Sequence, residues 1–195
     1  MPVVPLSGFV DFVISSGTTR LTKVQAIKRQ IEQGYAPERD FYKGIREGIL
    51  EFHRGQRSSF DDLAVQSDKK KIAHYAEIIN GYKLFLKKEH PSFFNPVDST
   101  WSIGELSVTI NPEAGFDLKD GGQAMVKLYF KSLVLSRQRV DLVLHLMKSN
   151  LPTRIPPAIL DARRGRMYYH KSDSKNLDAL LAGEAAAFIE IWRLV

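Results

Sequence analysis

The period of the hydrophobic pattern changes near Trp101, and this change limits the possible folds more than any other feature of the sequence. Up to residue 91, apolar side chains recur every three or four positions, as they do along one face of an α-helix. From residue 106 they recur at every second position, so that Leu106, Val108 and Ile110 would share one face of a strand. Helices followed by alternating strands predict an α+β fold.

A glycine-containing turn, Lys119-Asp120-Gly121-Gly122, leads into a second alternating run that ends at Lys131. We expect this turn to centre on its first glycine, which would place Glu113 beside Tyr129 on the return strand. Because alternate residues share a face, the pattern predicts one polar cluster on this side of the sheet. Its members are Glu113, Lys127, Tyr129 and Lys131, and Asp117 could join them.

The remaining segments carry their own signals. Capping residues and apolar stripes predict helices over residues 23–33, 38–54, 69–88 and 136–149, and from 177 to the end. A second strand pair, 158–162 and 166–170, flanks the turn Arg163-Arg164-Gly165. The order of elements is therefore helices, then ββα, then ββα. This order predicts a mainly antiparallel sheet that is covered by helices on at least one face.

The length of 195 residues fits a single domain, residues 1–195. We expect a helical half, 1–91, and a sheet-bearing half, 101–195, with the aromatic segment 92–100 as the connection between them. The apolar start of the chain lacks a basic segment and includes Asp11. We therefore interpret it as a packed arm and not as a signal peptide.

Composition excludes several classes of protein. The chain has no cysteine, so disulfides and thiolate metal sites are excluded. No apolar stretch approaches the roughly 18 residues of a membrane span, and a cytoplasmic protein without membrane contact is expected. The 28 basic and 22 acidic residues give a formal charge of +6. This charge is compatible with a nucleic-acid partner, because phosphate binding relies on clustered lysine and arginine.

The predicted hairpin and its surroundings resemble the PD-(D/E)XK nuclease-like superfamily over about the middle third of the chain. In that superfamily an acid ends one strand, an acid-x-Lys triplet lies on the next strand, a helix follows, and an earlier helix often adds a Glu. The resemblance implies catalytic roles for Glu113, Lys131 and a helix-borne acid, Glu51 or Glu47. It also implies a metal site at Glu113 and Asp117 that would hold Mg²⁺ or Mn²⁺ for phosphodiester hydrolysis.

The chain departs from this pattern at one decisive position. Its triplet reads Tyr129-Phe130-Lys131, so a tyrosine stands where the second metal-binding acid belongs. A hard divalent cation needs several carboxylate ligands on a rigid support, and the lost acid favours a non-catalytic protein without a cofactor. The nucleotide-loop and hydrolase motifs GxGxxG, GxxxxGK[ST] and GxSxG are also absent from the sequence.

Basic and aromatic residues elsewhere suggest what a non-catalytic domain would bind. Three arginines surround the second predicted turn and two tyrosines follow it, a combination that can hold phosphates and stack on a base. A solvated turn whose arginines pair with nearby acids is the alternative. The candidate nucleic-acid contacts are Lys127, Tyr129, Arg137, Arg163, Arg164 and Arg166.

The sequence thus predicts an α+β binding domain whose partner is a nucleic acid or a protein. The alternative is a metal-dependent phosphodiesterase built on a degenerate nuclease-like core. A third hypothesis is a homodimer, with Phe93, Phe94 and Trp101 contributing to the dimer surface.

Overall fold

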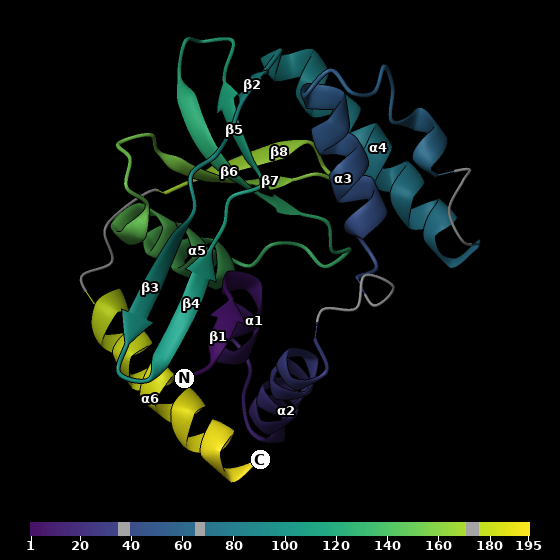
Figure 1. Ribbon diagram of the computed structural model, residues 1–195. Helices are drawn as coiled ribbons and strands as arrows, with labels where there is room; N and C mark the ends of the chain where they lie inside the picture. Colours follow the sequence, from purple (N-terminus) through teal and green to yellow (C-terminus); the bar gives the residue numbers. More distant parts are fainter. Residues whose placement is uncertain (35–39, 65–68, 171–175) are drawn as a thin grey trace.

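The fold is α+β, as the sequence predicts, and it is built on two separate β-sheets (Figure 1). The computed structural model describes residues 1–34, 40–64, 69–170 and 176–195. The larger sheet has the strand order β2-β5-β6-β7-β8, and the smaller one has the order β1-β4-β3. Four of the six pairings among these strands are antiparallel, while β1 with β4 and β6 with β7 are parallel.

The strands are short, and four of the eight that are described lie close to their predicted positions. The larger sheet consists of β2 (Ser92–Phe94), β5 (Ala114–Asp117), β6 (Gln123–Tyr129), β7 (Pro157–Asp161) and β8 (Arg166–Tyr169). The smaller sheet consists of β1 (Val3–Pro5), β3 (Ser99–Ile103) and β4 (Leu106–Ile110). Strands β1 and β2 occupy segments that the sequence pattern suggested only as an arm and a connection.

Except for the first, which forms within the expected arm, the described helices lie close to their predicted positions. They are α1 (Leu6–Val13), α2 (Thr18–Glu32), α3 (Lys43–His53), α4 (Lys69–Glu89), α5 (Arg137–Asn150) and α6 (Leu177–Leu194), with a 3₁₀ turn η2 (Asp61–Leu63). Ser136 caps α5 as predicted, because its hydroxyl accepts a hydrogen bond from the backbone N–H of Arg139 at 3.2 Å. Pro37, in the first turn of the helix predicted from residue 38, and Ser67 or Asp68, the predicted cap of the helix from residue 69, lie outside the described residues.

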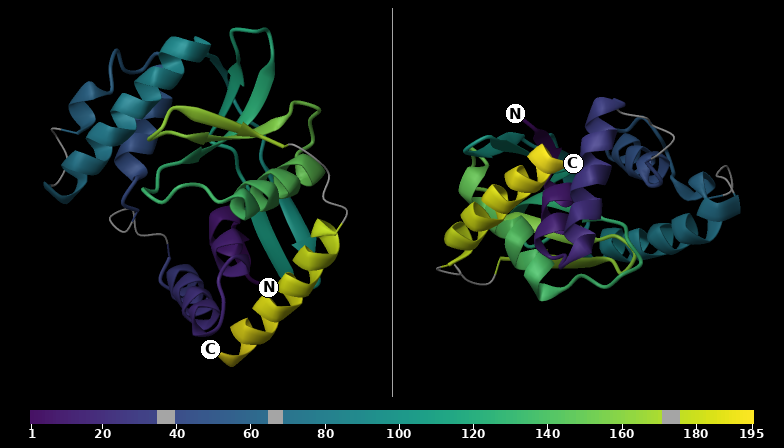
Figure 2. Two further views of the ribbon diagram at one scale, coloured as in Figure 1. Left: turned by 180° about the vertical axis from the view of Figure 1, so that it is seen from behind. Right: turned by 90° about the horizontal axis from the view of Figure 1, so that it is seen from below.

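The larger sheet is covered on both faces (Figures 1 and 2). On one face, Val126 of β6 and Leu160 of β7 join a core with α3 and α4. On the other face, Met125 and Ile159 join a second core with α1, α5, α6 and the smaller sheet. Burial on both faces explains why β7 reads Pro-Ala-Ile-Leu-Asp without alternation, since a doubly covered parallel strand needs apolar side chains on each side.

The N-terminal helices do not pack as one helical half. Phe9 and Phe12 of α1 lie in the same core as Phe188 of α6, whereas the buried residues of α3 and α4 lie in the other core. The ring centroids of Phe12 and Phe188 are 5.1 Å apart in an edge-to-face arrangement. The apolar start of the chain is therefore a packed arm, as expected, but it packs against the C-terminal part of the fold.

The predicted hairpin forms with a different partner strand and a different register. Strand β4 pairs with β1 and β3, and it is the short β5 that returns into β6. The turn closes with a hydrogen bond from Leu118 N–H to Gly122 O at 2.7 Å, so its centre is Asp120, with Gly121 in the left-handed region at φ 82°. Ala114 consequently faces Val126, and Glu113 lies beside Lys127 rather than beside Tyr129.

Helix α4 comes unusually close to the turn between β7 and β8, which falls at Arg163-Arg164-Gly165 as predicted. A Cβ atom at Gly81 of α4 would overlap the backbone of Arg163 and the carbonyl oxygen of Ala162. Gly165, at φ 59°, would in turn overlap the carbonyl oxygen of Gly81. Two glycines thus let a helix and a turn meet backbone to backbone, which fixes α4 against the end of the sheet.

Candidate functional site

Glu113 and Lys127 form a closed ion pair at the start of the β5–β6 hairpin. Glu113 Oε1 lies 2.7 Å from Lys127 Nζ, and Oε2 accepts the backbone N–H of Leu128 at 2.8 Å. Lys127 also donates to the backbone and side-chain oxygens of Asn111. Both carboxylate oxygens of Glu113 are therefore engaged in holding the loop before β5 to strand β6.

Lys131 belongs to a different group of side chains. Its ammonium lies 2.9 Å from Oδ2 of Asp11 in α1, and the guanidinium of Arg139 in α5 lies 2.5 Å from the other oxygen of that carboxylate. Burial of Asp11 raises its pKa, but the hydrogen bond and charge of Lys131 and the charge of Arg139 outweigh burial and leave the pKa below its ordinary value. Asp11 thus stays ionised between two cations.

A second buried acid stands beside this group at the end of β7. Asp161 is fully buried and lies opposite Tyr129 in the parallel register of β6 and β7. Its Oδ2 lies 2.8 Å from the guanidinium of Arg164, which also donates to the carbonyl oxygen of Ser132 at 2.9 Å. Arg164 therefore neutralises Asp161 and ties the turn after β7 to the segment after β6.

Together these side chains form a cluster at the carboxyl ends of the two parallel strands, which we name the carboxyl-edge cluster. Its members are Asp11, Tyr129, Lys131, Arg139, Asp161 and Arg164. Burial raises the pKa of Tyr129, the charges of Asp161 and Asp11 raise it further, and those of Arg139 and Arg164 oppose them. The cluster is held by the contacts of Asp11 with Lys131 and Arg139, by the contact of Asp161 with Arg164, and by the register that pairs Tyr129 with Asp161. In open sheets with parallel strands, ligands usually bind beyond these carboxyl ends.

The other predicted contacts have partners of their own. Arg163 donates to the carbonyl oxygen of Phe130 at 2.6 Å, and its terminal nitrogens contact Glu77 and the ring of His74. Arg166 lies over the ring of Tyr168, 5.1 Å from its centroid. Arg137 is 85% exposed and has Asp141 as a loose partner at 3.6 Å. Arg137, two residues before Arg139, and Arg166, which pairs with Asp161 in the β7–β8 register, are both exposed to solvent.

The acids expected to hold a metal are not assembled into one site. Glu51 of α3 pairs with Arg57, Glu47 lies 3.7 Å from Lys43, and Asp117 accepts a hydrogen bond from Gln123. Among the residues that the structure describes, no three histidine or acidic side chains are grouped as a metal site would require. The predicted set of Glu113, Lys131 and Glu51 is thus distributed over three separate contacts.

Sequence reasoning missed Asp11 and Asp161, the two acids that hold the cations of the carboxyl-edge cluster. Asp161 had a visible signal, because an acid directly after a buried strand often lies at the functional edge of a sheet. Asp11 had none, since α1 is far from β6 and α5 in sequence and its carboxylate meets Lys131 and Arg139 only in the folded chain.

A half-buried histidine on α3, His53, lies among aromatic side chains and has a lowered pKa. The Nε2 atom of His53 lies 2.7 Å from the hydroxyl of the buried Tyr82, and its ring lies among Phe52, Phe93 and Phe116. Burial lowers the pKa of His53 from the ordinary value of 6.5 to about 4. The neutral ring accepts the hydrogen bond of Tyr82, and protonation would remove that acceptor.

We therefore expect the stability of the fold to decrease as the pH falls from 6.5 toward 4. Over this range the unfolded chain binds a proton at residue 53 and the folded chain does not, so unfolding is favoured. With a reduction for the partial exposure of the ring, the expected loss is about 1–2 kcal/mol. Urea unfolding at several pH values would measure it. The His53→Gln variant, which keeps an acceptor but does not titrate, should lack this part of the pH dependence; an unchanged slope would contradict the assignment.

Comparison of the chain with protein-family models, with curated proteins and with solved structures found no match. Within the described residues, no helix is both long enough and apolar enough to cross a bilayer.

Proposed function

We propose that this protein is a non-catalytic, nucleic-acid-binding domain and that it contacts phosphates through the carboxyl-edge cluster and the neighbouring Arg137. The observation that carries the proposal is the concentration of cations at one edge. Three cations face two carboxylates there, so one positive charge is in excess before Arg137 is counted. The cations are Lys131, Arg139 and Arg164, and the carboxylates are those of Asp11 and Asp161. Phosphate contacts of this kind supply most of the affinity of non-specific nucleic-acid binding.

The accessible cations of this edge are the ones that would meet a phosphate. The side chain of Lys131 is 43% exposed and that of Arg137 is 85% exposed, whereas Arg139 is largely buried in its pair with Asp11. Arg164 is tied to a buried acid. Lys131 and Arg137 are therefore the cations that a ligand would reach first, whereas Arg139 and Arg164 hold the acids of the cluster. The absence of cysteine is compatible with a cytoplasmic location, and the proposal places the protein there.

We expect the double variant Lys131→Gln/Arg137→Gln to bind nucleic acid more weakly and with less dependence on salt. Each lost phosphate contact reduces the slope of log affinity against log salt by about one. Fluorescence anisotropy with short single-stranded and duplex oligonucleotides across a salt series would measure both quantities. The control is Lys87→Gln/Lys88→Gln, which removes the same charge from the last turn of α4. Absence of binding at low salt, or equal effects of the two double variants, would overturn the proposal.

A protein partner would be the outcome if oligonucleotides do not bind. Leu133 is 74% exposed and Val134 is 68% exposed, and both lie in the segment that follows Lys131. A homodimer through Phe93, Phe94 and Trp101 has less support, since all three side chains pack against the chain's own cores. A sedimentation measurement of the mass at high protein concentration would test self-association.

The second candidate function is a metal-dependent phosphodiesterase on a degenerate nuclease-like core. In its favour, the β5–β6 hairpin is followed by a helix and preceded by α3, which bears Glu51. Two observations oppose this candidate. A tyrosine occupies position 129, and both carboxylate oxygens of Glu113 are already bound, one by Lys127 and the other by the backbone N–H of Leu128. Titration with Mn²⁺ that changes neither the melting temperature nor the NMR spectrum would contradict this candidate.

A further inference from the structure

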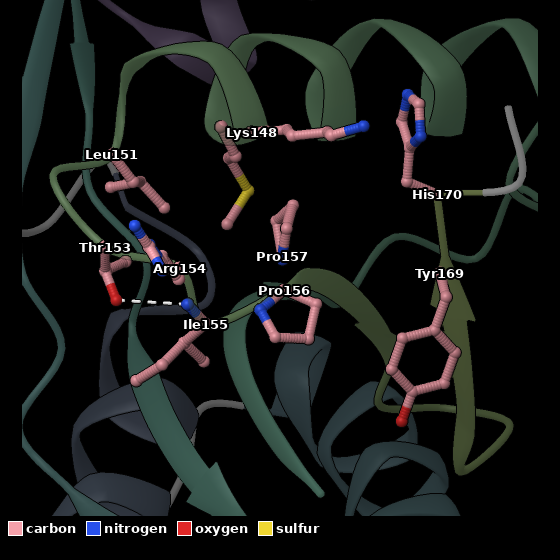
Figure 3. Close-up of a pocket in the computed structure, with 10 residues that line it drawn as sticks. Lys148, Leu151, Thr153, Arg154, Ile155, Pro156, Pro157, Tyr169 and His170 are labelled. Atoms are coloured by element: carbon pink, nitrogen blue, oxygen red, sulfur yellow. Dashed lines mark hydrogen bonds between the residues drawn. The ribbon is translucent and has the colours of Figure 1, made fainter. Parts of the chain in front are cut away.

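A cavity of about 460 Å³ lies at the end of the larger sheet that is opposite to the carboxyl-edge cluster (Figure 3). Its walls come from the last turn of α5, the loop that follows it, the start of β7 and the end of β8. Figure 3 shows Pro156 and Pro157 in the middle of the site, with Lys148 and His170 on the side of α5. The volume falls in the range of about 300–1,000 Å³ that is typical of small-molecule sites.

The floor of this cavity is apolar and already in place. Met147, Leu151 and Pro157 are buried, and Ile155 is partly buried beside them. Hydrogen bonds fix the loop that forms one wall: the N–H of Ile155 donates to the hydroxyl of Thr153 at 3.1 Å, and Met125 of β6 donates to the carbonyl oxygen of Pro156 at 3.0 Å. A ligand would thus find its apolar surface preformed, which reduces the entropy lost on binding.

The rim of the cavity is basic. Lys148, Arg154 and His170 line it, and none of the described residues that line it is acidic. Arg154 is exposed and has neither a hydrogen bond nor an ion pair with another residue in the described part of the chain. The carbonyl end of α5, which would repel an anion, is partly covered, because Leu146 O accepts from the Asn150 amide and Met147 O accepts from the N–H of Leu151.

We propose that this cavity binds a small amphipathic anion, a molecule with one carboxylate or phosphate on an apolar body. The apolar body would lie on Met147, Leu151 and Pro157, and Arg154 would meet the anionic group at the rim. A guanidinium suits this role because its planar array of donors matches both carboxylate and phosphate oxygens. The ring of Tyr169, which is 42% exposed at the same cavity, supplies an aromatic surface beside it. The site is independent of the proposed nucleic-acid contacts.

The test uses the whole chain and the fluorescent anion 1-anilinonaphthalene-8-sulfonate, with its uncharged counterpart N-phenyl-1-naphthylamine. We expect the anion to bind the folded protein and Arg154→Glu to weaken its binding about tenfold, since this change replaces an attractive contact by a repulsive one. Arg29→Glu, the same reversal on the exposed face of α2, is the matched control and should leave the affinity unchanged. Cooperative urea unfolding of each variant establishes that the probe reports on folded protein.

Competition then identifies the anionic group. Octanoate that displaces the probe supports a carboxylate ligand, and phenyl phosphate that displaces it supports a phosphate monoester. Equal binding of the probe to the wild type and to Arg154→Glu would overturn the proposal. It would also be overturned if neither octanoate nor phenyl phosphate displaced the probe, or if the protein bound N-phenyl-1-naphthylamine as tightly as the anion. The Lys131→Gln/Arg137→Gln variant should keep full affinity for the probe, so failure here is distinguishable from failure of the proposed nucleic-acid function.

Discussion

Gly81→Ala is expected to lower the free energy of unfolding by about 3 kcal/mol, because the added methyl group would overlap the backbone of the β7–β8 turn. A flexible side chain could rotate away from such a methyl group, but the atoms in the way are the carbonyl groups of Ala162 and Arg163. Relief would require α4 to move away from the sheet, which would open the core between them. Urea unfolding followed by circular dichroism would measure the loss.

Gly183→Ala is the matched control for this prediction. Gly183 lies within α6, and a Cβ atom there would meet no other atom within 4 Å. Alanine should stabilise this helix by about 0.5–1 kcal/mol, since it restricts the unfolded chain and fits the helix without strain. The same substitution thus has opposite signs at the two sites. A stable Gly81→Ala variant would mean that α4 does not lie against the turn.

Arg164→Ala is expected to cost about 3 kcal/mol, because it leaves the carboxylate of Asp161 buried without its cation. The loss of the hydrogen bond from Arg164 to Ser132 adds to the effect. Arg137→Ala is the control, since an exposed arginine with one loose partner should change the stability by less than about 0.5 kcal/mol. Equilibrium unfolding in urea would measure both variants.

A double-mutant cycle separates the buried charge from the loss of arginine itself. In Asp161→Asn protein the uncompensated charge no longer exists, and Arg164→Ala should then cost much less than in the wild type. We expect a coupling energy of about 2 kcal/mol between the two residues. Additive effects would show that the pair is not what holds the ends of β6 and β7 together.

Local signals in the sequence predict a large part of this fold. The helices from α2 to α6, the strands β7 and β8 and the turn at Arg163-Arg164-Gly165 follow from patterns within a few residues of one another. Strands β1 and β2 have only three residues each, too few for a period to be recognised, and they form because a partner strand is already present. The parallel pairing of β6 with β7 depends on the crossover through α5, which no local pattern encodes.

The site is less predictable than the fold because its contacts are distant in sequence. The register of the hairpin depends on which residue occupies the centre of a three-residue turn, and a shift of this centre from Gly121 to Asp120 moved Glu113 from Tyr129 to Lys127. Alternation correctly placed Glu113 and Lys127 on one face, since a shift of two residues preserves the face. The partner of Lys131 is Asp11, 120 residues earlier, and only the folded chain shows it.

The contact between α1 and α6 has a consequence for the synthesis of the protein. Phe12 emerges from the ribosome early, and Phe188, which packs edge-to-face against it, emerges near the end of the described chain. The core that contains both residues therefore cannot close before α6 has been synthesised, and its apolar residues stay incompletely packed until then. Contacts of such wide sequence separation also slow the final step of folding. Deleting α6 should thus leave a nascent-like chain that exposes α1 and depends on chaperones.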